Sequence, residues 1–190
     1  PYVEGWAEKN HFPKEIVKKF GTIGAFGPTI PAQYGGGGMD YISYGLIMQE
    51  IERGDSGMRS TASVQGSLVM YPIYSFGSEE QKNKYLPKLA SGEMLGCFGL
   101  TEPNHGSNPS GMETKFEDKG DHYLVNGQKT WTSGGQWADK CFALVRTDRT
   151  KKQEGISFLL IDMDSPGVEV KPIRLISGAS PFCETFFTDV

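Results

Sequence analysis

The stretch CFGLTEPNHGSNPSGM, residues 97–112, marks the point at which the character of the sequence changes. Its first four residues are typical of a buried strand, and they give way at once to hydroxyls, amides and glycines. A strand that ends in such a loop can bring backbone amides close to a polar ligand. Because Gly, Pro, Asn and Ser are also ordinary turn formers, the local pattern by itself favours a simple surface turn.

The residues before this stretch have helical spacing, with apolar side chains returning about once per turn. Ser78, followed three positions later by Gln81, forms a capping box for a helix that closes near Gly92. Pro72 is expected to kink the helix that contains it. Helices are therefore predicted over residues 13–20, 40–53, 60–76 and 78–92.

After Gly96 the hydrophobic period changes to two, in short segments rich in β-branched and aromatic residues that are separated by turn formers. Asn126 and Gly127 give the strongest hairpin signal, because both residues of a tight hairpin turn need positive φ. We therefore predict an α+β protein of two domains. An all-α domain over residues 1–93 precedes an antiparallel β-barrel or sandwich over residues 94–190.

Composition limits the function. The chain has 190 residues, 37% hydrophobic and 22% charged, with a net charge of −4 and no basic cluster, so neither nucleic acid nor an anionic membrane is expected as a partner. No apolar run approaches the length of a membrane span. The cysteines stand singly in apolar stretches, which argues against a zinc or disulfide framework and fits a cytoplasmic protein: Cys97, Cys141 and Cys183.

The familiar catalytic patterns do not occur. The histidines, His11, His105 and His122, lack the spacing of a metal site and are interpreted as solvated or capping residues, so no metal is expected. The glycines at 35–38 follow no strand and precede no G-K-S/T, which favours a flexible turn over a phosphate loop. No G-x-S-x-G elbow supports a serine hydrolase.

Two polar loops at strand ends remain, TEPNHGS at 101–107 and WTSGG at 131–135. Each offers hydroxyls and amides beside an aromatic side chain, Phe98 in one case and Trp131 in the other. That combination suits a planar heteroaromatic cofactor, whose ring face needs apolar cover and whose edge needs hydrogen bonds. Taken alone, Trp131 is more typical of a barrel core.

The segments GCFGLTEPNHGSNPSGMET (96–114) and NGQKTWTSG (126–134) resemble the acyl-CoA dehydrogenase family. The helical half, residues 34–74 and 77–93, is most similar to the glutaryl-CoA dehydrogenase branch. Members of the family continue into a C-terminal helical bundle that contains the glutamate base. The resemblance therefore implies a fragment, with the bundle absent and no catalytic residue in residues 1–190.

The resemblance also implies which residues bind ligands. In the family the first loop holds FAD and the acyl-CoA thioester together, and Glu102 is expected to be a structural carboxylate rather than the base. The residues that match the FAD-binding positions are Phe98, Leu100, Thr101, Gly106, Ser107, Trp131, Thr132 and Ser133. Those that match substrate-binding positions are Arg59, Ser60 and Ser107.

For the intact enzyme the resemblance implies α,β-dehydrogenation of an acyl-CoA, with electrons passed to an electron-transfer flavoprotein by a homotetramer. Two departures bear on this. Ser133 replaces the usual threonine, and residues 131–190 look more like broad-range acyl-CoA dehydrogenases, which leaves the substrate unassigned, with glutaryl-CoA as one candidate. Two alternatives stay open: a non-catalytic flavin- or acyl-CoA-binding module or heteromer subunit, and a flavin oxidase or monooxygenase. The isolated chain is expected to be inactive.

Overall fold

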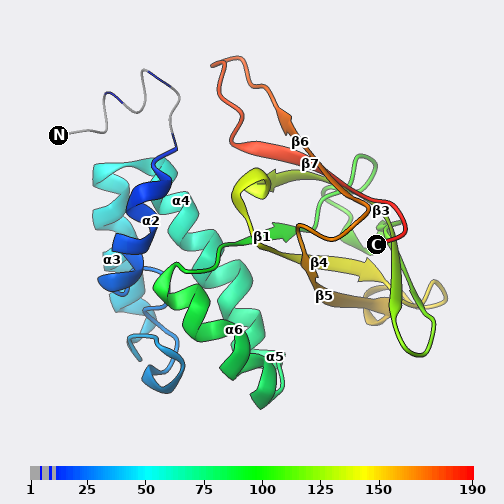
Figure 1. Cartoon of the computed structure of the whole chain (residues 1–190), viewed down its shortest axis with the longest axis horizontal. Helices are drawn as coiled ribbons and strands as arrows, with labels where there is room; N and C mark the ends of the chain where they lie inside the picture. Colours follow the sequence, from blue (N-terminus) through cyan, green and yellow to red (C-terminus); the bar gives the residue numbers. More distant parts are fainter. Residues whose placement is uncertain (1–4, 6–8, 10–11) are drawn as a thin grey trace. The chain divides into compact units, whose positions relative to one another are not determined.

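The computed structural model describes residues 5, 9 and 12–190, so His11 lies outside the described residues. The chain divides into two compact units, Pro1–Leu95 and Gly96–Val190 (Figure 1). The first unit is helical and the second is built on a β-sheet, which confirms the predicted fold class.

The caps predicted at Asp40, Ser78 and Gly92 are present in the first unit. The Asp40 carboxylate accepts a hydrogen bond from Ser43 N at 2.8 Å, and Ser78 and Gln81 form the expected reciprocal capping box. Gly92 ends its helix in the left-handed conformation, φ 71°. The helices are α2 (Lys14–Thr22), α3 (Tyr41–Gly54), α4 (Ser56–Ser63), α5 (Tyr71–Phe76) and α6 (Glu79–Ser91), with a 3₁₀ turn at Ala32–Tyr34.

The helix predicted over residues 60–76 is less regular than expected. It begins earlier, at α4, where Asp55 caps the first turn by accepting from Met58 N at 2.6 Å. A π-helical turn, Val64–Met70, then joins α4 to α5. Pro72 follows this turn without a break in the helical backbone, since Met70 and Tyr71 are both in the right-handed helical conformation, and it has no N–H to donate to the preceding turn. The irregularity, the π-helical turn, therefore lies on the N-terminal side of Pro72.

Seven strands form one sheet in the part of the chain that the structure describes (Figure 1). Their order is β1-β4-β2-β3-β7-β6, with β5 paired to the other side of β4. The strands are β1 (Gly96–Gly99), β2 (Lys115–Asp118), β3 (Tyr123–Ser133), β4 (Lys140–Arg146), β5 (Ile156–Asp162), β6 (Val168–Ile173) and β7 (Phe182–Phe187). Short 3₁₀ turns lie between them at Pro109–Gly111, Gly135–Trp137 and Gln153–Gly155.

The sheet is mixed, whereas the sequence predicted antiparallel pairing throughout. Four pairs are antiparallel, β2–β3, β3–β7, β4–β5 and β6–β7. β1 runs parallel to β4, with Cys97 opposite Cys141, and β2 meets β4 in parallel at a single position, Lys115 opposite Arg146. The parallel pair arises because β2 and β3 intervene in the chain between β1 and β4 and return it to the same end of the sheet.

The predicted hairpin turn at Asn126–Gly127 is wrong, because both residues lie inside the continuous strand β3. β3 pairs with β2 as far as Asn126 and with β7 from Gly127 onward. A Cβ on Gly127 would lie 2.4 Å from Thr114 Oγ1, so the glycine permits a close approach of chains. The Asn126 side chain donates to the Asp189 carboxylate at 2.9 Å and accepts from Asp189 N at 3.0 Å. Long-range pairing thus overrides the local turn signal.

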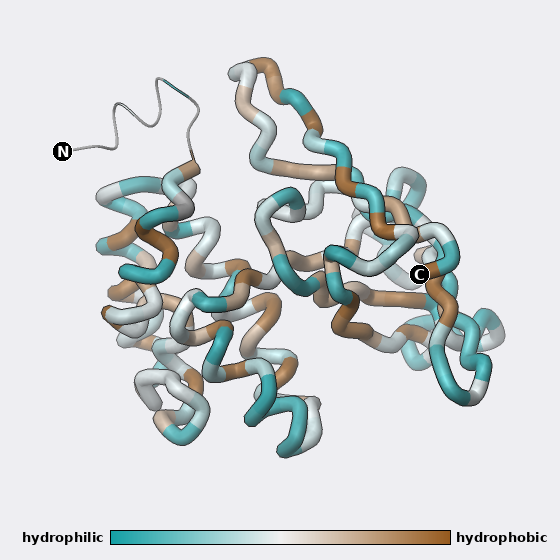
Figure 2. Tube along the Cα trace, viewed as in Figure 1, coloured by the Kyte–Doolittle hydropathy of each residue, from teal (hydrophilic) through white to brown (hydrophobic). Residues whose placement is uncertain are grey.

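The core of the second unit lies on one face of the sheet, and Figure 2 shows hydrophobic residues concentrated along β4 and β5. Its buried members come from five different strands: Cys97, Val125, Cys141, Ala143, Val145, Ile161 and Phe187. No helix in the described part of the chain is long and apolar enough to cross a membrane. Among the same residues, no group of three or more His, Cys, Asp or Glu side chains could hold a metal ion.

Candidate functional site

The two polar loops singled out in the sequence lie side by side in the second unit. Thr130 N donates to Thr101 O at 2.8 Å, which joins the end of β3 to the loop that follows β1. One residue away, Lys129 Nζ donates to Leu100 O at 3.2 Å. These two bonds place the TEPNHGS loop beside Trp131, so the sheet brings together residues about thirty positions apart in the sequence.

A β-bulge interrupts β3 beside this loop. Lys129 lies opposite Thr185, whereas Thr132 lies opposite Cys183, so β3 contains one more residue than β7 over this interval. Trp131 lies within the bulge, and its backbone adopts φ 59°, a left-handed conformation that is uncommon for a bulky residue. Bulges often redirect a side chain next to a functional site.

The bulge reverses the alternation of the strand. Strict alternation from Val125 through Lys129 would bury Trp131 on the same face of the strand. Instead Trp131 is 53% exposed and packs edge-on against Phe182, with ring centroids 6.0 Å apart. The core interpretation of Trp131 is therefore wrong, and its indole is available to a ligand.

Thr132, the next residue, is fully buried in its place. Its Oγ1 accepts a hydrogen bond from Thr185 Oγ1 at 3.2 Å, and the buried side chain is not accessible to a ligand. Ser133, one residue further, is half-buried at the end of β3. The hydroxyl of Ser133 is thus better placed than that of Thr132 for the predicted role.

The other predicted residues of this region differ in what they can offer. Phe98 stacks on Phe142 at 5.5 Å between centroids, so one face of its ring is already covered within the sheet. Thr101 is half-buried, and neither its amide nor its hydroxyl donates a hydrogen bond to any residue that the structure describes. Gly106 and Ser107 are exposed in the loop. Thr101 accordingly keeps two donors that a ligand could use.

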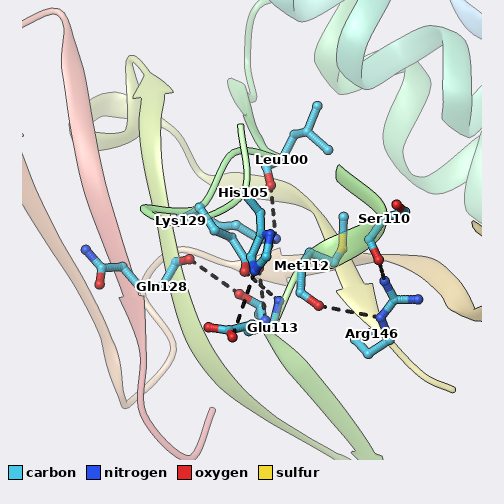
Figure 3. A network of polar contacts seen from close by, with 10 residues as sticks. Leu100, His105, Ser110, Met112, Glu113, Gln128, Lys129 and Arg146 are labelled. Carbon is cyan, nitrogen blue, oxygen red and sulfur yellow. Dashed lines mark hydrogen bonds and ion pairs between the residues drawn. The ribbon is translucent and has the colours of Figure 1, made fainter. Parts of the chain in front are cut away.

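A buried ion pair, Lys129 with Glu102, lies at the start of this loop, and Figure 3 shows the bond from its lysine to Leu100. Lys129 is completely buried, and its Nζ lies 2.8 Å from Glu102 Oε1. Glu102, 4% exposed, also accepts from Thr114 N at 2.9 Å and from Glu113 N at 2.5 Å. These bonds use the Glu102 carboxylate inside the protein, as expected for a structural carboxylate.

The pair determines the charge state of Glu102. Burial by itself would raise the pKa of this carboxyl, but the hydrogen bonds from Lys129, Thr114 and Glu113 outweigh burial and lower the pKa below its ordinary value of 4.5. For Lys129, burial lowers the pKa and the bond to Glu102 opposes this effect only in part. Glu102 is therefore ionised at neutral pH and makes a poor proton acceptor.

The lowered pKa predicts a pH dependence of stability. Because the folded state binds the Glu102 proton more weakly than the unfolded chain, Glu102 stabilises the fold above pH 4.5 and loses this contribution as the pH falls through and below that value. Urea denaturation between about pH 3 and pH 6 should show a steeper loss of unfolding free energy for the wild type than for Glu102→Gln. Glu154→Gln, which removes an exposed carboxylate, serves as the control. Equal slopes for the wild type and Glu102→Gln would contradict the prediction.

A second buried cation, Arg146, holds the far end of the same loop (Figure 3). Its guanidinium donates to the carbonyl oxygens of Ser110 and Met112, the latter at 3.5 Å. It also donates to Lys151 O at 3.1 Å and Lys152 O at 2.6 Å. All four of these acceptors are backbone carbonyls, so peptide dipoles stabilise the buried positive charge.

The predicted substrate-binding residues Arg59 and Ser60 lie on α4 in the first unit. Arg59 Nε donates to Glu52 Oε2 at 2.6 Å, and its Nη1 lies 3.4 Å from Ser63 Oγ. The carbonyl of Ser60 accepts from the Ser63 hydroxyl at 3.0 Å. Two of the five guanidinium donors are thus engaged, and the Nη edge keeps the capacity to bind a carboxylate.

Sequence reasoning missed Lys129 and Arg146, although a weak signal exists for Lys129. It stands in register with the inward-facing Val125 of β3, where a lysine is unusual unless it has a buried partner. No local pattern in the sequence shows that this partner is Glu102, because the two residues meet only through the pairing of distant segments.

The chain matches two family models, the acyl-CoA dehydrogenase N-terminal domain over residues 1–93 and the acyl-CoA dehydrogenase middle domain over residues 97–190. The helical unit and the curled mixed sheet agree with these two matches, and the chain belongs to the acyl-CoA dehydrogenase family. It contains the N-terminal and middle domains of that family.

Comparison with individual proteins shows that the chain is similar to glutaryl-CoA dehydrogenases within this family. A glutaryl-CoA dehydrogenase from Desulfococcus multivorans is 40% identical over 195 residues, which include 100% of this chain and 50% of that protein. The crystal structure of a glutaryl-CoA dehydrogenase from Mycobacterium smegmatis in complex with FADH2 matches 100% of this chain and 48% of its own, with a TM-score of 0.91 and 45% identity. A glutaryl-coenzyme A dehydrogenase structure in complex with glutaryl-CoA gives a TM-score of 0.94 at 40% identity, over 100% of this chain and 49% of its own. The chain spans about half the length of the relatives it matches.

Proposed function

We propose that the protein containing this chain is an FAD-dependent acyl-CoA dehydrogenase that oxidises the Cα–Cβ bond of an acyl-CoA thioester, with glutaryl-CoA as its first candidate substrate. In this reaction the substrate loses a proton from Cα and a hydride from Cβ and becomes an α,β-unsaturated thioester. The observation that supports the proposal most is the half-exposed indole of Trp131, which the bulge turns outward beside the donors of Thr101.

The residues present fit a flavin. An isoalloxazine needs an apolar cover for its ring face and hydrogen-bond donors for its carbonyl edge. Trp131 offers the first, while the amide and hydroxyl of Thr101 and the hydroxyl of Ser133 offer the second. The crystal structure from Mycobacterium smegmatis contains FADH2, which supports the same cofactor here.

When bound, FAD supplies the acceptor for the hydride from Cβ. The residues of this chain bind and orient the reactants: Trp131, Thr101 and Ser133 the flavin, and Ser107 the flavin and the CoA thioester. Glu102 does not serve as the base, because it is buried, its lowered pKa makes it a weak proton acceptor, and its oxygens are hydrogen-bonded inside the unit. We assign no base to residues 1–190.

For the substrate, we propose that Arg59 pairs with the distal carboxylate of glutaryl-CoA, next to Ser60. The structure of a glutaryl-coenzyme A dehydrogenase with glutaryl-CoA bound supports a dicarboxylyl substrate. A preference of the wild type for unsubstituted acyl chains would instead favour the broad-range character of residues 131–190. We further propose an electron-transfer flavoprotein as electron acceptor and a cytoplasmic homotetramer as the active form.

Replacing Trp131 by Ala should weaken FAD binding by about tenfold and change the visible flavin spectrum. The indole is the largest apolar surface that the site presents, and its loss leaves one region of the ring face exposed to water. The dissociation constant can be measured by flavin fluorescence and the spectrum by absorbance.

Trp137→Ala, a tryptophan in the 3₁₀ turn that follows β3, is the matched control and should retain FAD. Unchanged affinity and spectrum in Trp131→Ala would remove the main support for the flavin site.

Anaerobic flavin reduction by glutaryl-CoA or butyryl-CoA tests the activity itself. Flavin binding without reduction by either would favour a non-catalytic module.

A further inference from the structure

The buried ion pair is linked directly to the residues that are proposed to bind the flavin. Lys129 Nζ bonds both Glu102 Oε1 at 2.8 Å and Leu100 O at 3.2 Å (Figure 3). Lys129 stands two residues before Trp131, and Thr130 between them donates to Thr101 O at 2.8 Å. One ammonium group thus connects the strand bearing the indole to the loop bearing the Thr101 donors.

Glu102 extends the connection to a third segment. Its two oxygens accept from the backbone amides of Glu113 and Thr114, immediately before β2. The pair therefore joins β3, the start of the TEPNHGS loop and the residues just before β2 through four hydrogen bonds, and both of its charged side chains are buried. Charge-assisted hydrogen bonds of this kind are short and directional.

Stability alone is a weak reason for such a pair. Removing two charges from water costs several kcal/mol, and well-packed apolar residues of similar volume often stabilise a fold as much or more. Apolar side chains, however, would give Leu100 O and the amides of Glu113 and Thr114 no directional partner. The pair provides a defined geometry that apolar packing does not.

We propose that Lys129 is a positioning residue of the flavin site. Through its bonds to Leu100 and Glu102 it holds Thr101 and the Trp131 bulge in their binding arrangement before the cofactor arrives. This inference rests on the proposed function, because it takes FAD as the ligand. Preorganisation raises affinity because the ordering cost is met during folding rather than during binding.

The test uses the protein as encoded in full and measures FAD affinity, the flavin spectrum and thermal stability on the same samples. Lys129→Met keeps the buried methylenes and removes the ammonium, and it should raise the dissociation constant for FAD by about tenfold and alter the spectrum. Val125→Ala, a buried residue of the same strand away from the loops, is the destabilised control and should keep the wild-type affinity and spectrum.

A double variant separates positioning from stability. Lys129→Met leaves the Glu102 carboxylate buried without its counter-charge, which lowers the melting temperature. In Lys129→Met/Glu102→Gln no charge is buried and the Gln carbonyl still accepts from Thr114 N, whereas Glu113 N loses its acceptor, so the melting temperature should return in part. FAD affinity should stay low, because the bond to Leu100 O is still missing.

The outcomes are distinct. Recovery of affinity together with stability in the double variant, or wild-type affinity in folded Lys129→Met, would overturn the positioning role and leave the proposed function intact. A wild-type protein that does not bind FAD would refute the proposed function, and the inference with it. If Lys129→Met alone does not fold, the double variant decides.

Discussion

Arg146→Met is expected to lower the free energy of unfolding of the second unit by about 3–5 kcal/mol. The substitution keeps a buried aliphatic side chain and removes the donors that bind four backbone carbonyls, at Ser110, Met112, Lys151 and Lys152. Each buried carbonyl that loses its hydrogen bond lowers the free energy of unfolding by about 1–3 kcal/mol. The carbonyls nearest the surface contribute less, because water can donate to them instead. Urea denaturation followed by circular dichroism measures the change.

Arg149→Met is the matched control, because Arg149 is exposed in the turn between β4 and β5. Its replacement should change the unfolding free energy by less than about 0.5 kcal/mol. If both variants lose the same small amount, Arg146 is dispensable and water replaces it as a donor to the loop.

Arg59→Ala is expected to lower kcat/KM for glutaryl-CoA by about tenfold to a hundredfold and to leave butyryl-CoA nearly unchanged. The proposed bond between the guanidinium and the distal carboxylate is charge-assisted and worth roughly 1.5–3 kcal/mol in a partly desolvated position. Loss of this bond lowers kcat/KM for glutaryl-CoA by the stated factor. Butyryl-CoA has no distal carboxylate, so its kcat/KM is nearly unchanged. Steady-state kinetics with both substrates measures it.

Arg53→Ala is the control for this experiment. Arg53 is exposed on α3 and forms an ion pair with Glu50 at 3.0 Å, as Arg59 does with Glu52 at 2.6 Å. Both pairs are exposed enough that their loss affects stability little. Equal losses on both substrates in Arg59→Ala would assign Arg59 to the structure of the first unit rather than to substrate binding.

Local signals predicted the helical unit well. The caps at Asp40, Ser78 and Gly92 act within one turn, so a short window of sequence contains all the partners that fix the helix ends. The π-helical turn, Val64–Met70, had no such signature. There Gln65 donates to Leu89 O at 2.9 Å and to Met94 O at 2.7 Å, bonds to residues far along the chain.

The β-unit was predicted as a class and not in its details. Period-two hydrophobicity located the strands, but the hairpin assigned to Asn126–Gly127 failed because β2 and β7 both pair with β3 and extend it through the expected turn. The bulge at Trp131 was equally hidden, since it depends on the register between β3 and β7.

For the site, the two loops were predicted to serve one ligand, and the structure places Thr101 beside Trp131. The Lys129–Glu102 pair below them was missed because the two residues are 27 positions apart and meet only after the sheet forms. Which residues contact FAD or substrate stays a prediction for the variants above to test.

The change of partner within β3 also governs the order in which the second unit can assemble. β2 lies just upstream and pairs with β3 as soon as both have been made, whereas β7 follows about fifty to sixty residues later. During synthesis, residues 127–133 therefore emerge as an unpaired strand edge, which invites association with other chains. A nascent chain stalled before Phe182 would expose that edge, so aggregation during translation is a particular risk of this topology.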